Sequence, residues 1–167
     1  MRGNVFSTAY MLSNLVAVLI VYLCILKPVI GRMTMSLLFI AAAVVNTVIS
    51  ISHPQIYMTY ADVAAIPAYV QFINEYFSRH ITLYVLTIAA GQFLIGTFLV
   101  WKGPVEKLAL TGAIIFLLAI APLGAGASFP CTLLLALGCA LLLKEKNIQP
   151  WPLTLLHFTT ERKRTIS

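Results

Sequence analysis

Five long apolar runs divide this chain, and they constrain its fold more than any other feature. A helix that crosses the hydrocarbon core of a bilayer needs about 20 mostly apolar residues. Each run ends at a charged residue or histidine, at a proline or glycine, or at both, which are the residues that end helices. The sequence therefore predicts one all-α membrane domain over residues 1–167 with five transmembrane helices. These helices are expected at residues 8–26, 33–52, 81–101, 108–125 and 128–143.

The shortage of charge agrees with this prediction. Of the 167 residues, 60% are hydrophobic and only 10% are charged, whereas a soluble domain has about 25% charged residues. So few charges cannot cover the surface of a small water-soluble protein. Most of the surface is therefore expected to contact lipid.

The last two runs are separated only by the stretch PLGAGASFP. Residues 108–143 contain no charge and could form a single very long helix. The stretch places Gly124 and Gly126 between Pro122 and Pro130, which is a strong helix-breaking combination. Two antiparallel helices joined by a tight turn are expected instead.

The basic residues predict the orientation in the membrane. Cytoplasmic loops of membrane proteins carry an excess of Lys and Arg. With the N-terminus outside, the cytoplasmic side holds nine basic residues, namely Lys27, Arg32, Lys102, Lys107, Lys144, Lys146, Arg162, Lys163 and Arg164. The outer side holds two, Arg2 and Arg79. We expect a multi-pass protein of the inner or plasma membrane, with loop 53–80 outside and the tail 144–167 in the cytoplasm. Because the basic residues flank apolar runs, they indicate topology and lipid contact, and no nucleic acid partner is expected.

The outer segment 53–80 is the longest polar interruption. Pro67 suits the first position of a helix, and a short amphipathic helix is expected over residues 67–79. Its apolar stripe would consist of Tyr69, Phe72, Ile73, Tyr76 and Phe77. Glu75 and Arg79 are four residues apart and can pair on such a helix. This pattern is typical of a helix that lies in the membrane interface or covers the mouth of a bundle.

Several polar residues are candidates for ligand binding. Within the apolar runs no ionisable residue is expected at mid-helix depth, and the neutral Asn46 and Gln92 must find partners on neighbouring helices or bind a ligand. His53, Asp62, Glu75 and His80 are metal-ligand types, but their spacing matches no known motif, so neither a metal site nor a catalytic group is predicted. The candidate ligand-binding residues are Asn46, His53, Glu75, Tyr76, Arg79, His80 and Gln92.

Gln92 and Gly96 lie in one apolar run that ends at the turn Lys102-Gly103, and Pro122 and Gly124 lie at the break in the next run. Through these residues, positions 32–146 resemble the DoxX-like family of small membrane proteins. The resemblance implies a four-helix bundle, to which this chain adds one N-terminal helix. Family members often have an acidic residue where Gln92 stands here. The resemblance also implies an accessory or quinone-proximal role.

Three functions are compatible with these features. We expect an accessory or structural subunit of a larger membrane complex, without its own catalytic centre, whose partners are lipids and other membrane subunits. The alternative is a membrane component of an oxidoreductase that binds quinone or lipid in an apolar cleft near Asn46, Gln92 and the outer aromatic residues. A small transporter is the third, but it would need repeats, broken helices or buried charges, and only the break at residues 122–130 fits.

Overall fold

The computed structural model describes residues 8–145, and within this range the chain is helical and has no strand. The prediction of an all-α chain is confirmed for these residues. The elements in chain order are α1 (Thr8–Leu26), α2 (Pro28–Ser52), the 3₁₀ helix η1 (Pro54–Asp62), α3 (Pro67–Glu75), the 3₁₀ turn η2 (Phe77–Arg79), α4 (Ile81–Phe98), α5 (Pro104–Ile120), the 3₁₀ segment η3 (Ala121–Ala127) and α6 (Cys131–Lys144).

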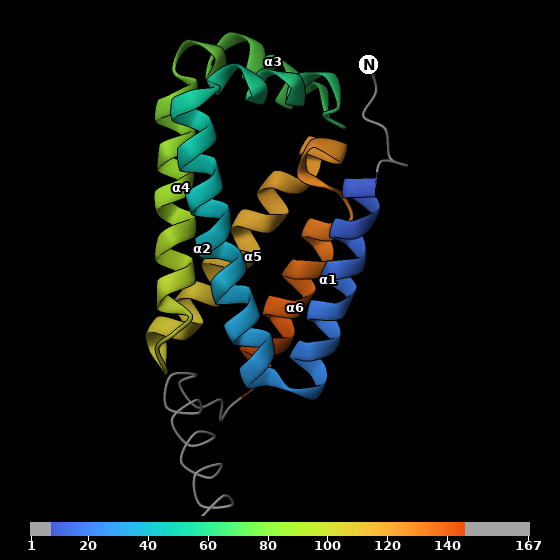
Figure 1. Cartoon of the computed structure of the whole chain (residues 1–167), viewed down its shortest axis with the longest axis vertical. Coiled ribbons are helices and arrows are strands. Elements are labelled where there is room, and N and C mark those ends of the chain that lie inside the picture. The colour runs from blue at the N-terminus through green and yellow to red at the C-terminus, as the bar shows by residue number, and fades with distance from the viewer. Residues whose placement is uncertain (1–7, 146–167) are drawn as a thin grey trace, which may run out of the picture.

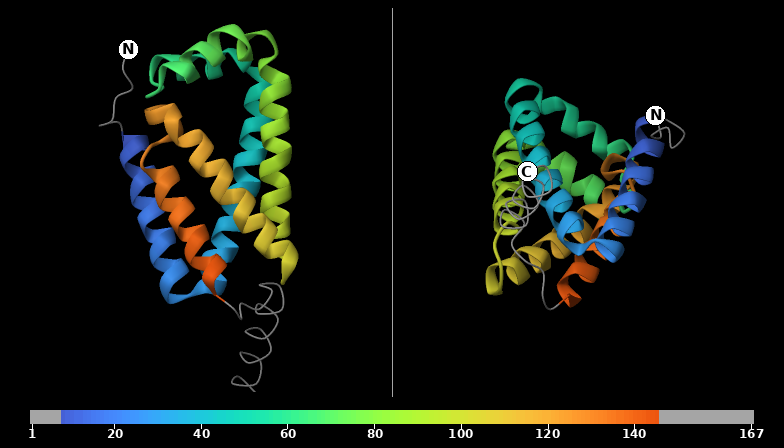
Figure 2. Two further views of the ribbon diagram at one scale, coloured as in Figure 1. Left: turned by 180° about the vertical axis from the view of Figure 1, so that it is seen from behind. Right: turned by 60° about the horizontal axis from the view of Figure 1, so that its bottom comes forward.

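The five long helices run alternately between two ends of the molecule (Figure 1). α2 and α4 lie side by side, α1 and α6 form a second pair, and α5 crosses diagonally between the pairs (Figures 1 and 2). Among the described residues, three segments are long and apolar enough to cross a membrane, namely Pro28–Ser52, Ile81–Phe98 and Pro104–Ala127. The apolar helices over Tyr10–Leu26 and Cys131–Lys144 are shorter.

Two helices begin earlier than the sequence analysis expected. α2 begins at Pro28 rather than at residue 33, and α5 begins at Pro104 rather than at residue 108. Proline favours the first helical position, where its missing N–H costs nothing and its fixed φ angle is already helical. Pro28 and Pro104 therefore start the helices that follow them, in addition to ending the apolar runs that precede them.

α2 and α4 are joined by polar contacts along their length. The Ser36 hydroxyl donates to the Gly96 carbonyl over 2.6 Å, and the Thr82 hydroxyl donates to the Ser50 carbonyl over 3.0 Å. Gly96 lets the backbones approach, because a Cβ atom there would lie 2.9 Å from the Ser36 oxygen. Small residues and hydroxyl groups are the usual means of close helix packing in membranes.

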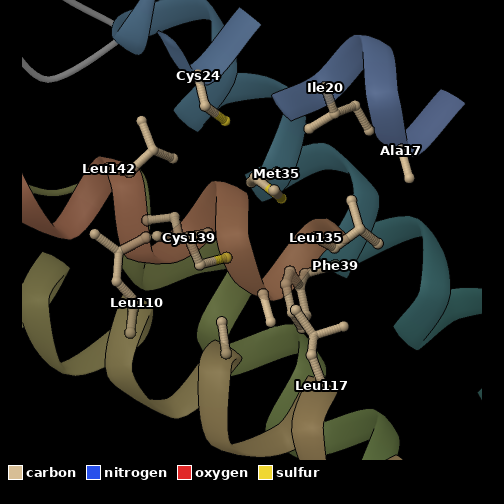
Figure 3. Close-up of a cluster of buried hydrophobic side chains, with 14 residues drawn as sticks. Ala17, Ile20, Cys24, Met35, Phe39, Leu110, Leu117, Leu135, Cys139 and Leu142 are labelled. Carbon is tan, nitrogen blue, oxygen red and sulfur yellow. The ribbon is translucent and has the colours of Figure 1, made fainter. Parts of the chain in front are cut away.

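The main core lies where α1, α2, α5 and α6 meet (Figure 3). Met35, Leu110 and Cys139 are fully buried there. α1 packs directly on this core, because glycines on two neighbouring helices leave room for Cys24: a Cβ atom on Gly31 would lie 2.8 Å from the Cys24 sulfur, and one on Gly138 would lie 3.4 Å from it. The N-terminal helix is therefore an integral part of the bundle.

The outer segment, from η1 to η2, covers one end of the bundle (Figure 2). Two hydrogen bonds join it to α5 and η3: the Tyr69 hydroxyl donates to the Ala119 carbonyl of α5 over 2.6 Å, and the Ala65 N–H donates to the Pro122 carbonyl of η3 over 2.9 Å. Gly124 has a φ of +62°, and a Cβ atom there would lie 2.6 Å from the Val63 oxygen. The glycine thus allows the outer segment to lie against the break after α5.

The opposite end contains a buried ion pair. Arg32 and Glu106 are 2.6 Å apart between Nη1 and Oε1, and both residues are buried. The sequence alone predicts that Arg32 lies in a cytoplasmic connection. The early start of α2 instead brings it into the second turn of that helix, where Glu106 from the first turn of α5 meets it.

Candidate functional site

A pocket of about 460 Å³ lies beneath the outer segment. Such a volume is in the range of sites that hold small organic molecules. Its wall is formed by α2, η1, α3, η2, α4, α5 and η3. The lining residues are Asn46, Tyr57, Tyr60, Tyr69, Phe72, Ile73, Phe77, Tyr84, Val85, Ile88, Gln92, Phe116, Ile120, Leu123, Gly126, Ala127 and Ser128.

A chain of three polar side chains forms part of this wall. The Tyr57 hydroxyl donates to Asn46 Oδ1 over 2.9 Å, and Asn46 Nδ2 donates to Gln92 Oε1 over 2.8 Å. Tyr57 and Gln92 are buried, and Asn46 is half-buried. A buried amide without a partner is costly, so this chain of hydrogen bonds fixes the orientation of both amide groups.

The direction of the two helices brings Asn46 and Gln92 together. In an α-helix the Cα–Cβ bonds tilt toward the N-terminus. α2 and α4 run in opposite directions (Figure 1). The side chain of Asn46 is therefore expected to lean away from the outer end and that of Gln92 toward it. The two amides can therefore meet although Gln92 lies about 16 Å along α4 from its first residue.

Aromatic side chains form the outer part of the wall. Tyr57 and Tyr60 pack edge to face, with ring centroids 5.8 Å apart. Tyr84 of α4 stacks on Phe77 at 5.7 Å and meets Phe72 edge to face at 5.8 Å. These contacts hold the outer segment against α4, and they make the outer wall of the pocket aromatic with few polar groups.

Burial keeps the phenol groups of η1 protonated. It raises the pKa of Tyr57, and the neighbouring Tyr60 raises that pKa further. Burial also raises the pKa of Tyr60. Because the ordinary pKa of tyrosine is about 10, both groups carry their proton at neutral pH, and Tyr57 acts as a hydrogen-bond donor to Asn46.

The structure brings two of the seven candidate residues to the pocket. Asn46 and Gln92 line it. The remaining five, His53, Glu75, Tyr76, Arg79 and His80, are exposed and do not line it. Within residues 8–145, no group of three or more His, Cys, Asp or Glu side chains gathers to hold a metal ion.

The expected pairing of Glu75 with Arg79 is replaced by another contact. The predicted helix 67–79 ends at Glu75, and residues 77–79 form a 3₁₀ turn. The two residues are therefore not on successive turns of one α-helix, as an i, i+4 pair requires. Glu75 Oε1 instead accepts a hydrogen bond from Gln71 Nε2 over 3.1 Å.

Sequence reasoning missed several residues of the pocket. Phe116, Ile120 and Ser128 belong to the last two apolar runs, where nothing in the sequence distinguishes a pocket wall from a helix face. Tyr57 and Tyr60 lie in η1, which was expected to be a loop. The sequence feature that could have identified them is the repeated tyrosine in the outer segment, which includes positions 57, 60 and 69. Buried tyrosines usually find a hydrogen-bond partner, so such tyrosines are candidates for contacts with polar residues of the helices.

Comparison of the chain with protein-family models, with curated proteins and with solved structures gives no match.

Proposed function

We propose that this chain is a multi-pass membrane protein that binds a lipid-soluble small molecule in the pocket beneath its outer segment. The observation that carries the proposal is the hydrogen-bonded chain Tyr57–Asn46–Gln92 in the wall of an otherwise apolar and aromatic pocket. A few fixed polar groups in an apolar cavity are typical of small-molecule sites, because the apolar wall supplies affinity and the polar groups supply orientation.

Five membrane crossings with the outer segment outside the cytoplasm complete the proposal. In support, α1 and α6 are apolar and pack on the core between the longer helices. Among residues 8–145, the end with the outer segment carries one basic residue, Arg79. The opposite end carries Lys27, Arg32, Lys102, Lys107 and Lys144. This distribution agrees with the positive-inside pattern and supports a location of the pocket at the outer leaflet.

Filling the pocket tests the proposal. Ile88 lines the pocket on α4, whereas Leu83 lies on the same helix and is exposed away from it. Ile88→Trp is expected to weaken binding about tenfold or more, because overpacking a formed cavity costs about 1–3 kcal/mol. Leu83→Trp adds the same indole to the outer surface of α4 and serves as the control.

The measurement is mass spectrometry of the lipid-soluble molecules that remain bound to protein purified in mild detergent. The proposal expects one class of molecule to accompany the wild-type chain and Leu83→Trp, and to be depleted in Ile88→Trp. Equal retention by all three proteins, or no retained molecule with any of them, would show that the pocket is not a binding site.

The accessory-subunit function and the DoxX-like resemblance stay predictions. The apolar outer faces of the helices suit lipid as well as another subunit, so they do not favour a complex over a single chain. A bound quinone would be one instance of the molecule proposed here. The break over residues 121–130 is packed against the outer segment by the contact between Gly124 and Val63, and no feature of it favours transport.

A further inference from the structure

Gln92 has a donor that the protein itself does not use. Only 6% of the residue is exposed, and its Oε1 accepts the hydrogen bond from Asn46. Within residues 8–145, its Nε2 group makes no hydrogen bond, and the side chain forms part of the pocket wall. Two N–H groups in an apolar cavity without an acceptor are costly. The pocket therefore offers this donor to whatever occupies it.

The hydrogen bonds of Asn46 orient the Gln92 amide. The Tyr57 hydroxyl donates to Asn46 Oδ1, and Asn46 Nδ2 points toward Gln92. Nδ2 in turn requires the Gln92 oxygen as its acceptor, and this leaves Nε2 for the pocket. Each group in the chain thus donates to the next: Tyr57 of the outer segment to Asn46 of α2, and Asn46 to Gln92 of α4. The remaining donor, Gln92 Nε2, is left for the bound molecule.

The other polar groups of the wall do not impose such a direction. Tyr60, Tyr84 and Ser128 also line the pocket, and the hydroxyl group that each carries both donates and accepts. An amide nitrogen only donates. A molecule that meets Gln92 Nε2 must therefore offer it an acceptor, whereas the hydroxyl groups can bind either a donor or an acceptor.

We infer that the pocket selects molecules whose apolar body carries a carbonyl oxygen, and that Gln92 Nε2 binds this oxygen. The inference rests on the proposed function and adds the class of molecule. A carbonyl of this kind occurs in lipid-soluble ketones and quinones and in the ester groups of glycerolipids. A ketone or quinone and a glycerolipid ester would both accept a hydrogen bond from Gln92 through a carbonyl oxygen. The experiment below distinguishes these two kinds of ligand.

The test uses two pairs of probes that differ in the carbonyl. The first pair is 2-acetylnaphthalene and 2-ethylnaphthalene, and the second is a dioleoyl glycerol diester and the corresponding diether. Binding of each probe is measured on the full chain in detergent. We expect the wild-type protein to prefer the carbonyl member of one pair about tenfold, the effect of one hydrogen bond to a buried donor, and the pair that shows the preference identifies the source.

Two variants assign the preference to Gln92. Gln92→Met keeps a side chain of similar length without a donor and is expected to abolish the preference while 2-ethylnaphthalene still binds. Gln71→Met makes the same change on the exposed face of α3 and is expected to keep it. A wild-type protein that binds both members of each pair equally would overturn the inference and leave the proposed function intact. A protein that binds none of the four probes would overturn both.

A measurement on the wild-type protein alone covers the case in which Gln92→Met does not fold. The carbonyl stretching band of ¹³C-labelled 2-acetylnaphthalene falls to lower frequency when its oxygen accepts a hydrogen bond. We expect the bound probe to absorb at a lower frequency than the same probe in an alkane solvent. A band at the alkane position would show that no donor contacts the carbonyl and would overturn the inference.

Discussion

The Arg32 guanidinium and the Glu106 carboxylate form a buried ion pair, 2.6 Å from Nη1 to Oε1, that joins the second turn of α2 to the first turn of α5. A buried pair is not a strong source of stability in itself, because both charges must leave water. Breaking a buried pair by removing one partner is costly, however.

We therefore expect Glu106→Gln to lower the free energy of unfolding by about 3–5 kcal/mol. The measurement is thermal or denaturant unfolding in detergent micelles. Glu145→Gln, at an exposed position just after α6, is the matched control and should change little. Replacing both partners by apolar residues, as in Arg32→Met with Glu106→Leu, should recover much of the loss. A Glu106→Gln protein as stable as wild type would mean that the pair is not buried.

The two glycines of α4 make a second comparison possible. A Cβ atom on Gly96 would lie 2.7 Å from Ile40 Cγ1, whereas one on Gly91 would meet nothing within 4 Å. We expect Gly96→Ala to destabilise the chain by about 1–3 kcal/mol through overpacking against α2. Gly91→Ala gains the helix propensity of alanine without a clash and should be neutral or stabilising. Equal unfolding temperatures for the two variants would contradict the close packing of α2 on α4.

Tyr69 ties the outer segment to α5 through its hydroxyl group. Tyr69→Phe removes this hydrogen bond and keeps the ring, so we expect faster hydrogen–deuterium exchange over residues 64–75 and faster release of a molecule from the pocket. Tyr76→Phe is the control, because the Tyr76 ring is exposed and its hydroxyl makes no hydrogen bond within residues 8–145. If both variants exchange at the wild-type rate, the hydroxyl of Tyr69 does not hold the segment in place.

Alkaline pH should lower the stability of the folded protein through ionisation of Tyr57. Its pKa in the folded protein is raised by burial above the ordinary value of 10.0, so the folded state holds this proton more tightly than the unfolded state. The resulting stability is fully present below pH 10 and is lost as the pH rises through the folded pKa. We expect the wild-type unfolding temperature to fall above pH 10 more steeply than that of Tyr57→Phe. Parallel curves for the two proteins would show that Tyr57 is not buried.

Labelling with a membrane-impermeant maleimide tests the orientation. Ser78 lies in the outer segment and Lys107 lies at the opposite end of the bundle. In a background with Cys131→Ser and with the buried Cys24 and Cys139 kept, Ser78→Cys is expected to react in intact cells. Lys107→Cys should react only after the membrane is opened. Reaction of both in intact cells would contradict the five-crossing topology, and reaction of Lys107→Cys alone would contradict the proposed orientation.

Sequence patterns determined the parts of this protein that depend on local chemistry. The apolar runs and the prolines and glycines between them predicted the helices, because in lipid each backbone polar group must bond within its own segment. The prolines and glycines of PLGAGASFP likewise predicted the break between the last two helices, because they interrupt helical hydrogen bonding. Asn46 and Gln92 stood out as candidates because amides in apolar helices require partners.

Only the tertiary structure decided which residues meet. The pairing of Arg32 with Glu106 joins positions 74 residues apart, and the Tyr57–Asn46–Gln92 chain joins a 3₁₀ helix to two antiparallel helices. These contacts depend on the relative rotation and depth of packed helices, which hydropathy does not encode. The exposed His53, Glu75, Tyr76, Arg79 and His80 show the same limit: their polarity marked the outer segment, but packing, and not polarity, determined which side of that segment faces the pocket.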